Sequence, residues 1–482
     1  MNITEGLNPE KVFRYFEEIC AIPHGSHNLE QISSYLVKFA EDRKLKYRQD
    51  EVLNVVIWKD GSEGYEASEP VILQGHMDMV AVKEAGCSKD LRSEGLDLAI
   101  DGDLLYAKKT SLGGDDGIAL AYALAILDDE TIPHPPLEVV ITTNEEVGLL
   151  GAAALDTSDL KGRMLLNLDS EDEGIFTVSC AGGVCASCIH PVETEEKNGE
   201  ILDLRLDGFI GGHSGAEIHL GRANAIVLLG KVLSDLYNEL GDEMRLIFVN
   251  GGEADNAIAI FAEATLSVPD AAATEALLTE SFKKVSAKYL EKDPALKITV
   301  SKKESSTQQV LKAGESSGLV KFLAQLPYGV QKMSPKVPGL VQTSLNPGLL
   351  EMTADTVQTA FSVRSSVDAE KEALVDDLRR LCSETGGHVE TTGDYPGWDF
   401  LPESRLCDTM VEAYREQYGK DPVVEGIHAG LECGIFAQKL PGIDAVSIGP
   451  QMQNIHTTRE RLSISSTERT WKLILNTLKK LK

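Results

Sequence analysis

Five side chains of types that bind metal ions occur in five separate short motifs of this sequence. They are His76 in QGHMDMV, Asp115 in SLGGDDGIA, Glu146 in TTNEEVG, Asp169 in LNLDSED and His456 in QNIHTTRE. Each motif alone is a weak signal, because a histidine at a strand end or an aspartate before a helix is more often structural. Together, two imidazoles and three carboxylates form a donor set that suits a pair of zinc ions.

A pair of metal ions at such a site needs a carboxylate that bridges them. One ion would polarise a carbonyl group, and the pair would lower the pKa of a shared water. A further carboxylate must take up and return the proton, and Glu145, next to Glu146, is the candidate. The spacing in HMD allows Asp78 to hydrogen-bond to His76 and to fix its tautomer. These residues therefore favour hydrolysis by a metal-activated water.

The motifs adjoin segments that we predict to be strands and helices of an open α/β sheet. Residues 69–78, 137–146 and 163–172 are apolar strands that end in polar residues, and residues 117–129 form a strongly apolar helix. In sheets of this class the functional residues lie beyond the carboxyl ends of the strands. The candidate ligands are therefore expected where an α/β active site belongs.

From about Val184 the pattern changes to that of helices packed on antiparallel strands. We expect two units of the ferredoxin-like kind, the second beginning near residue 295, in a domain inserted into the first domain. The final stretch returns to the α/β pattern, so the catalytic layer is expected to be discontinuous. The predicted domains are 1–183 and 393–482 for the catalytic part and 184–392 for the insertion.

Composition limits the expected partners and location. Acidic residues outnumber basic ones, 76 against 46, for a formal charge of −30. Such a surface repels phosphate backbones and anionic lipids, so we expect neither nucleic acid nor a membrane as a partner. The start of the chain lacks the pattern of a secretory signal, and the eight cysteines are too sparse for a disulfide scaffold. A cytoplasmic protein is expected.

Six motifs, in their order, resemble the series found in the co-catalytic zinc exopeptidases related to carnosinase, carboxypeptidase G and acetylornithine deacetylase. They are GHMD, GGDDGIA, NEEVGLLGA, NLDSED, GGHSG and NIHTTRE. HAGLECG, SVRSS and GDYPGW resemble the branch of aminoacyl-histidine dipeptidases. The resemblance spans almost the whole chain. It implies an α/β catalytic domain, with a mixed central sheet and helices on both faces, and an inserted α+β lid domain that usually dimerises.

The resemblance also implies how the metal ligands divide. His76 and Asp169 would bind one zinc ion, and Glu146 and His456 would bind the other. Asp115 would bridge the two zinc ions of the chain. Cobalt or manganese can share ligands of this kind with zinc. The resemblance further implies a cis peptide bond after Asp115.

The remaining roles follow from the same resemblance. Glu145 would be the general base, and Asp78 would orient a ligand histidine. His213 in GGHSG, on the lid, resembles the histidine that stabilises a tetrahedral oxyanion. Asn256 in ADNAIA and Arg364 in SVRSS resemble substrate-binding positions. A guanidinium can hold a carboxylate with two hydrogen bonds, although a surface salt bridge is the alternative for Arg364.

Substrate identity is the least constrained prediction. We expect a homodimer that hydrolyses small unblocked dipeptides, of the Xaa-His type or of a broader range. Another two-zinc amide hydrolase, such as a tripeptidase or an N-acyl amino acid deacylase, is the first alternative, and a non-catalytic binding protein on the same fold is the second. His428 in HAGLECG either borders the substrate pocket or caps the next helix.

Overall fold

A computed structural model describes residues 3–482, apart from the side chains of residues 304–306. The chain forms two compact units, each built from segments that are distant in sequence. Unit 1 contains the chain up to Cys180 together with Trp398–Gly426 and Leu431–Lys482, and unit 2 contains Ala181–Gly397 and Ile427–Gly430. The boundaries were expected after residues 183 and 392, and they lie after residues 180 and 397. The short segment 427–430 also belongs to unit 2.

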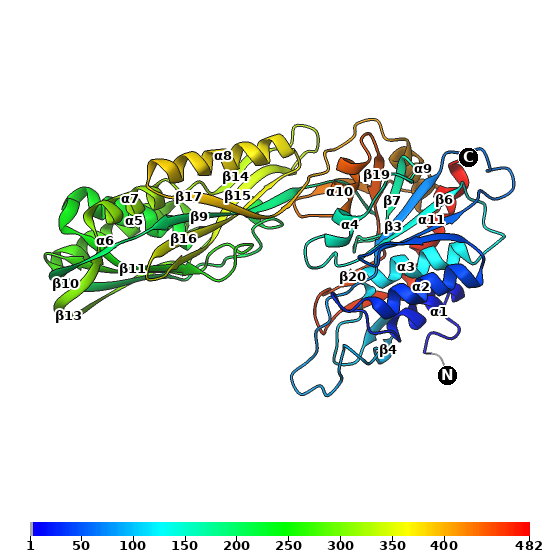
Figure 1. Ribbon diagram of the computed structural model, residues 1–482, viewed down its shortest axis with the longest axis horizontal. Helices are drawn as coiled ribbons and strands as arrows, with labels where there is room; N and C mark the ends of the chain where they lie inside the picture. Colours follow the sequence, from blue (N-terminus) through cyan, green and yellow to red (C-terminus); the bar gives the residue numbers. More distant parts are fainter. Residues whose placement is uncertain (1–2) are drawn as a thin grey trace. The chain divides into compact units, whose positions relative to one another are not determined.

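A mixed β-sheet forms the centre of unit 1 (Figure 1). Within the described residues its order is β1 (Lys46–Gln49), β2 (Val55–Lys59), β6 (Leu137–Thr142), β3 (Val71–His76), β7 (Met164–Asn167), β19 (Asp444–Ser447), β8 (Ile175–Cys180) and β18 (Val423–Ile427). Strands β6, β3, β7 and β19 are parallel neighbours, whereas β1, β2 and β8 pair in the antiparallel sense. The predicted α/β class is confirmed, and the carboxyl ends of β6, β3 and β7 meet at one edge.

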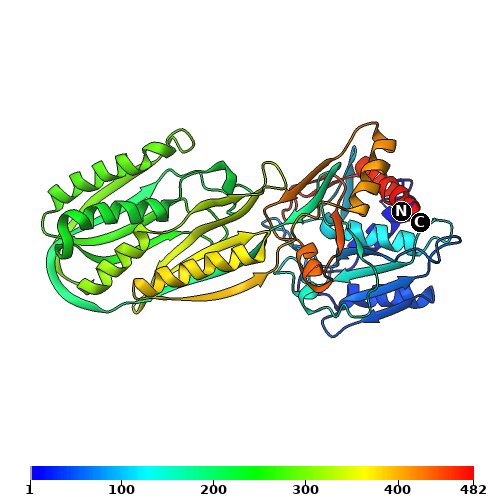
Figure 2. The same cartoon turned by 90° about the horizontal axis from the view of Figure 1, so that it is seen from above.

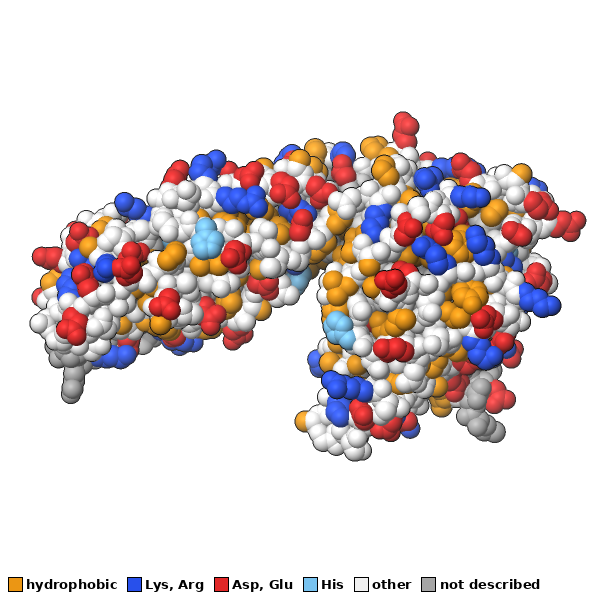
Figure 3. Space-filling view, in the orientation of Figure 1, with side chains coloured by type: hydrophobic (Ala, Val, Ile, Leu, Met, Phe, Trp, Pro, Cys, Tyr) orange, Lys and Arg blue, Asp and Glu red, His pale blue; other side chains and the backbone are white. Residues whose placement is uncertain are grey.

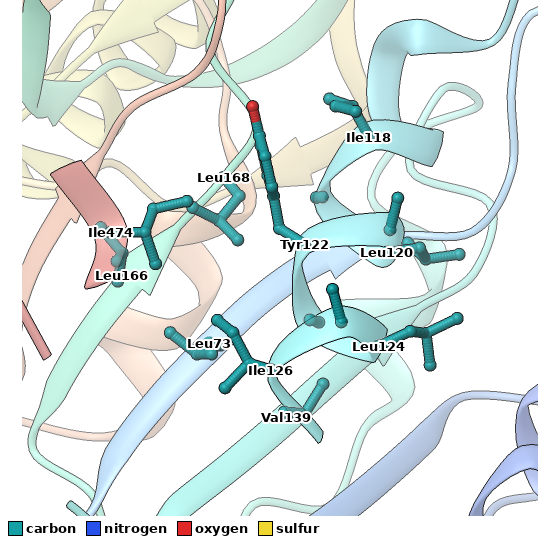
Figure 4. Packing of buried hydrophobic residues seen from close by; sticks show 14 of the residues in the cluster. Leu73, Ile118, Leu120, Tyr122, Leu124, Ile126, Val139, Leu166, Leu168 and Ile474 are labelled. Atoms are coloured by element: carbon teal, nitrogen blue, oxygen red, sulfur yellow. The ribbon is translucent and has the colours of Figure 1, made fainter. Parts of the chain in front are cut away.

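Helix α3 (Gly114–Leu127) anchors one face of this sheet. All of its residues are buried, as expected for a helix that is apolar on every side. Figure 4 shows its side chains from Ile118 to Ile126 among residues of β3, β6 and β7. The helix comes close because Gly75 has no side chain: a Cβ there would lie 2.6 Å from the Cβ of Ala119.

Other helices cover both faces, which confirms the predicted layering. They are α1 (Glu10–Cys20), α2 (Glu30–Asp42), α4 (Leu150–Ala154), α9 (Arg405–Tyr418), α10 (Glu432–Lys439) and α11 (Ile464–Lys480). Helix α10 lies on the face opposite α3, because its first residue, Glu432, contacts Gln74. Side chains alternate along a strand, so Gln74 points away from the face to which Gly75 belongs.

A second, small sheet of unit 1 joins two segments that are far apart in the sequence, 98–107 and 452–463. Its order is β20 (Met452–Gln453), β21 (Arg461–Ser463), β5 (Leu104–Ala107) and β4 (Leu98–Asp101). Strands β20 and β21 pair with each other and β21 pairs with β5, so the intervening loop is held at both ends. This loop contains NIHTTRE, which is how the C-terminal motif is fixed within unit 1.

Unit 2 contains two ferredoxin-like halves, one nested within the other. The inner half is β10 (Thr194–Asp207), α5 (Ala225–Leu240), β11 (Arg245–Gly252), β12 (Ala262–Val268), α6 (Ala271–Ser286) and β13 (Lys297–Leu311). The outer half is β9 (Gly182–Pro191), α7 (Ala313–Ala324), β15 (Val341–Met352), β16 (Thr356–Ser365), α8 (Asp368–Glu384) and β17 (His388–Tyr395), with β14 (Gly329–Met333) paired to β15. Each half has the βαββαβ order, as predicted.

The two halves of unit 2 share one antiparallel sheet, in the order β13-β10-β12-β11-β15-β16-β9-β17. They join where Gly251 and Gly252 of β11 pair with Leu350 and Leu349 of β15. The expectation that the second half begins near residue 295 is wrong, because β13 completes the inner half by pairing with β10. Helices α5 to α8 lie over the sheet and enclose an apolar core with it (Figure 2).

The surface carries both signs of charge despite the acidic balance of the sequence. Figure 3 shows acidic side chains over the visible face of both units, with lysines and arginines between them. Within residues 3–482, no helix has the length and apolar character that a membrane crossing requires.

His190 in β9 is a buried histidine in the core of unit 2. Its Nε2 lies 3.0 Å from the hydroxyl oxygen of Thr385, and its ring centroid lies 4.4 Å from that of Phe322. Burial lowers the pKa of His190 to about 4. The folded protein therefore keeps this imidazole neutral at pH values where an unfolded chain would protonate it.

We predict that this histidine makes the protein less stable as the pH falls from 6.5 toward 4. The unfolded state binds more protons over this range, so the free energy of unfolding must decrease. His190→Gln keeps a donor for Thr385 and cannot ionise. Between pH 7 and pH 5 the variant should lose less stability than the wild type, by on the order of 2 kcal/mol. Urea unfolding measures this, with exposed His219→Gln as the control, and equal losses in all three proteins would contradict the prediction.

Candidate functional site

All five candidate ligands lie in unit 1, where elements from both ends of the chain meet. His76 ends β3, Glu146 follows β6 by four residues, and Asp169 follows β7 by two. Asp115 lies at the start of α3, and His456 lies in the loop between β20 and β21. The parallel arrangement of the central strands brings the first three to one edge of the sheet. The other two reach the same region from α3 and from the small sheet.

Asp115 lies between the two histidines. Its Oδ1 is 3.1 Å from Nε2 of His76, and its Oδ2 is 2.9 Å from Nε2 of His456. Nε2 of His456 is also 3.0 Å from Oε1 of Glu146, and Nε2 of His76 is 3.5 Å from Oδ1 of Asp169. Asp115 thus presents one oxygen to each half of the cluster, which is the geometry expected of a bridging carboxylate.

Asp78 contacts both a candidate ligand and the backbone of the loop that carries Glu145 and Glu146. Its backbone oxygen lies 3.0 Å from Nδ1 of His76, and its Oδ1 lies 3.5 Å from the same nitrogen. The carboxylate also accepts hydrogen bonds from the backbone N–H groups of Glu145 and Glu146, at 3.0 and 3.4 Å, and from the hydroxyl of Ser26 at 2.8 Å. Asp78 therefore fixes both the imidazole of His76 and the loop that carries the two glutamates.

The cluster holds more carboxylates than imidazoles, and desolvation and mutual repulsion change the pKa values of these carboxyl groups. Burial raises the pKa of Asp169 to about 6 and raises the pKa of Glu145 well above its usual range. The imidazole of His456 donates hydrogen bonds to the carboxylates of Asp115 and Glu146, and these raise its pKa to about 11. Like charges held this close repel one another, and bound cations offset that repulsion.

The donor atoms are close enough to share metal ions. Three sets have their donor atoms within 4.8 Å of one another: Asp115 with Glu146 and His456, His76 with Asp116 and Asp169, and His76 with Glu145 and Glu146. Imidazole and carboxylate donors suit zinc, and also cobalt or manganese. The residues present therefore fit a pair of divalent ions. Asp116 is a candidate donor that the sequence analysis did not include.

Asp116 is tied to the same site through the backbone. Its Oδ2 accepts a hydrogen bond of 3.0 Å from the N–H of His76, and the peptide bond between Asp115 and Asp116 is cis, as expected. Its other carboxylate oxygen is buried and has no hydrogen-bond partner among the described residues. The DD pair in GGDDGIA was the available signal, but the sequence does not show which aspartate faces the histidines.

Glu460 is a second residue that the sequence analysis missed. Its buried carboxylate accepts hydrogen bonds from the backbone N–H groups of Leu112, Gly113 and Gly114, at 2.7, 3.1 and 2.8 Å. The loop that leads into α3 is thereby held to the loop that carries His456, four residues earlier in NIHTTRE. A glutamate in a polar loop gives no local signal of this contact.

Two further carboxylates lie near the cluster, those of exposed Glu171 and of buried Glu432. Partial desolvation by its neighbours raises the pKa of Glu171 to about 7, and the carboxylates of Asp115 and Asp169 add to that effect. Burial raises the pKa of Glu432, the first residue of α10, to about 8. Neither residue was predicted, although both stand within motifs that the sequence analysis singled out.

The other four predicted residues lie in unit 2. His213 and Asn256 belong to two paired segments, because the N–H of Ser214 donates to the carbonyl of Asn256 and the N–H of Ile258 donates to that of Gly212, each at 2.9 Å. Nδ1 of His213 accepts hydrogen bonds from the N–H groups of the following turn. Its Nε2 is therefore the atom left to act on a ligand.

Arg364 in β16 is a buried cation in unit 2. Its side chain is 8% exposed, its Nη1 donates to the hydroxyl of Tyr395 at 3.1 Å, and its Nε has no hydrogen-bond partner within the described chain. No carboxylate among the described side chains forms an ion pair with it. A Cβ on Gly215 would lie 3.1 Å both from Nε of Arg364 and from Cε1 of His213. A guanidinium buried without a counter-ion is costly unless an anionic ligand binds there.

His428 lies beside this cluster rather than at a helix end. Its Nε2 is 2.7 Å from the hydroxyl oxygen of Ser344, and burial, together with the charge of Arg364, lowers the pKa of His428 to about 3. The following helix, α10, has Leu431 at its N-cap and no side-chain cap. His428 therefore does not cap this helix, which was one of the two roles considered for it.

The chain matches known proteins along nearly its whole length. The model of peptidase family M20/M25/M40 matches residues 72–480. The cytosol non-specific dipeptidase of Escherichia coli (strain K12) is 36% identical over 479 residues, which is 98% of each chain. The solved structure of aminoacylhistidine dipeptidase from Vibrio alginolyticus has a TM-score of 0.93 at 33% identity, over 100% of this chain and 98% of that one. Aminopeptidase PepT from Bacillus cereus ATCC 10987 shares the fold, with a TM-score of 0.58 at 18% identity over 98% and 99% of the chains.

We predict that His76→Ala and His456→Ala each reduce the metal content of the purified protein. Each variant removes a nitrogen donor that lies within 3.1 Å of Asp115, so the ion on that side loses a strong ligand. Elemental analysis after dialysis measures the bound metal, and His388→Ala, an exposed histidine of unit 2, is the control. Full metal content in either site variant would mean that the ligands are misassigned.

Proposed function

Because the chain belongs to peptidase family M20/M25/M40, we propose that it is a metal-dependent dipeptidase that cleaves the peptide bond of small unblocked peptides. The observation that carries the proposal is the position of Asp115 between His76 and His456, with the half-buried carboxyl group of Glu145 nearby. The dipeptidases from Escherichia coli and Vibrio alginolyticus, which match nearly the full chain, support it.

The proposed centre holds two zinc ions. His76 and Asp169 would hold one, Glu146 and His456 would hold the other, and Asp115 would offer one oxygen to each. When bound, such ions would polarise the peptide carbonyl and lower the pKa of the attacking water. Asp78 keeps His76 in the tautomer that leaves Nε2 free for the metal, because it occupies Nδ1.

Glu145 is the proposed general base. It receives the proton of the attacking water and returns it to the leaving amine nitrogen. Its Oε2 lies 4.0 Å from Nε2 of His76. The backbone N–H of Glu145 donates a hydrogen bond to Asp78, which fixes the backbone position from which the side chain extends toward the ligands. Burial raises its pKa, which makes it a better proton acceptor than an exposed glutamate.

The residues of unit 2 are proposed to recognise the substrate. Arg364 binds the free carboxylate of the dipeptide, which supplies the missing counter-ion of the buried guanidinium. Nε2 of His213 donates a hydrogen bond to the oxyanion of the tetrahedral intermediate. Asn256 and His428 contribute further polar contacts to the substrate.

The proposal extends to assembly and location. A homodimer formed through unit 2, acting as a lid domain, and a cytoplasmic location are supported by the family resemblance. The name of the Escherichia coli relative also places that protein in the cytosol. Substrates of the Xaa-His type and a broader range of dipeptides are both compatible with the names of the two relatives.

A substrate panel tests the function and the role of Arg364. We predict that the protein hydrolyses dipeptides, and that it hydrolyses their C-terminal amides far more slowly, because the amides lack the charge that Arg364 binds. Arg364→Gln should raise KM for dipeptides about 10- to 100-fold, since a hydrogen bond to a charged group contributes about 1.5–3 kcal/mol. Exposed Arg379→Gln is the control.

Two results would count against this assignment. Cleavage of N-acyl amino acids without cleavage of dipeptides would make the protein a deacylase. If Arg364→Gln prefers dipeptides over their amides as strongly as the wild type does, Arg364 does not read the carboxylate.

Glu145→Gln should abolish turnover and leave the metal content unchanged. The amide cannot accept the proton from water, and a positioned general base contributes about 10²- to 10⁴-fold to the rate. Steady-state kinetics and elemental analysis on the same preparation separate the two effects. Glu84→Gln, an exposed exchange in unit 1, should behave as the wild type. Near-normal kcat in Glu145→Gln would remove this residue as the base.

A further inference from the structure

A buried polar network lies on one face of the unit 1 sheet, beneath the candidate metal ligands. Its members, Glu432, Gln74, Thr142 and Asn167, are each exposed by no more than 1%. Oε2 of Glu432 accepts a hydrogen bond of 2.5 Å from Nε2 of Gln74 and one of 2.6 Å from the hydroxyl of Thr142. Oε1 of Gln74 in turn accepts a hydrogen bond of 2.6 Å from Nδ2 of Asn167. One carboxylate therefore organises side chains from three strands.

These strands are the ones that carry metal ligands. Gln74 in β3 and Asn167 in β7 are register partners, and each precedes a candidate ligand, His76 and Asp169, by two residues. Thr142, the last residue of β6, is the register partner of His76. Residues two apart on a strand point to the same face, so Gln74 and His76 share a face of the sheet. The network thus lies one step along the strands from the ligands.

The network is costly for a protein interior. Glu432 has no ion-pair partner among residues 3–482, and its Oε1 is a buried oxygen that lacks a hydrogen bond to the described chain. Burying such polar groups costs free energy, and apolar side chains of similar size could fill the same volume at lower cost. What the polar groups provide is direction, because each of these short hydrogen bonds to Oε2 of Glu432 is strong only over a narrow range of distance and angle. Both the amide of Gln74 and the hydroxyl of Thr142 are aimed at one oxygen.

We infer that Glu432 is a positioning residue for the proposed metal centre. It holds the ends of β6, β3 and β7 in the relative register that lets their ligands meet at the same ions. The inference rests on the proposed function, because it presupposes that metal ions bind at His76 and Asp169. Glu432 acts through Gln74 and Thr142, so its influence should appear in metal affinity and ligand geometry.

Cobalt binding to the full-length apo protein tests the inference without using activity. Glu432→Leu removes the acceptor that Gln74 and Thr142 share. It leaves only longer contacts, from Nε2 of Gln74 to the hydroxyl oxygen of Thr142 at 3.4 Å and from that hydroxyl to the carbonyl oxygen of Gly75 at 3.3 Å. The variant should weaken Co²⁺ binding about 10- to 100-fold, the usual effect of losing a partner behind the ligands. The visible absorption spectrum of the Co²⁺-loaded protein should also change. Glu432→Gln keeps an acceptor oxygen for both donors, so it should restore affinity and spectrum to near the wild-type state.

Glu138→Leu is the matched control. Glu138 lies on β6, is 3% exposed, and accepts hydrogen bonds from the N–H groups of Lys161 and Gly162. It stands four residues before Thr142, toward the other end of the strand. Glu138→Leu should lower the free energy of unfolding while leaving Co²⁺ affinity and the spectrum unchanged.

The outcomes separate this inference from the proposed function. If the wild type binds no Co²⁺, the metal centre and the inference both fail. If the wild type binds Co²⁺ and folded Glu432→Leu matches it in affinity and spectrum, only the inference is overturned. If Glu432→Leu does not fold, Thr142→Val decides: it removes one donor with little change in shape, and it should still weaken Co²⁺ binding. Unchanged affinity and spectrum in Thr142→Val would then overturn the inference.

Discussion

The carboxylate of Asp115, with one oxygen at each of two imidazoles, is the contact around which unit 1 is organised. It requires His76 at the end of a central strand, His456 in a loop near the other end of the sequence, and a fixed start of α3. The fully buried α3 sets the depth of that start, and Glu460 holds the loop that precedes it by three backbone N–H groups. Much of the unit 1 architecture can be understood as the means of keeping this contact in place.

Both units bury charge that their own residues do not balance. Unit 1 gathers carboxylates around two imidazoles, and the raised pKa of Asp169 records the cost of burying and crowding them. Unit 2 buries the guanidinium of Arg364 beside the hydroxyl of Tyr395, and no carboxylate among the described side chains pairs with it. Such imbalances destabilise a protein alone, and a ligand of the opposite sign would offset each of them. Metal cations would satisfy the first, and a substrate carboxylate would satisfy the second.

The nested topology of unit 2 illustrates the limits of reading a chain in order. Local patterns correctly predicted ferredoxin-like units of helices packed on antiparallel strands. They placed the division near residue 295, whereas β13 pairs with β10 and closes the inner half. Strand pairing depends on partners roughly a hundred residues away, and hydrophobic alternation within a strand carries no information about which partner it meets.

The sequence by itself determined the fold class, the inserted second domain and the candidate ligands, because apolar strands that end in polar residues mark the active edge of an α/β sheet. Only the tertiary structure decided which other acidic residues hydrogen-bond to the strands and loops that carry those candidate ligands. Glu432 meets Gln74 across 358 positions, and Glu460 meets Leu112 across 348, so neither contact leaves a local trace. The position of His428 also leaves no local trace in the sequence. Its four-residue segment joins unit 2, although the residues on either side of that segment belong to unit 1. Composition and periodicity report whether a side chain is buried, whereas the identity of its partner is fixed by chain segments that meet only when the protein folds.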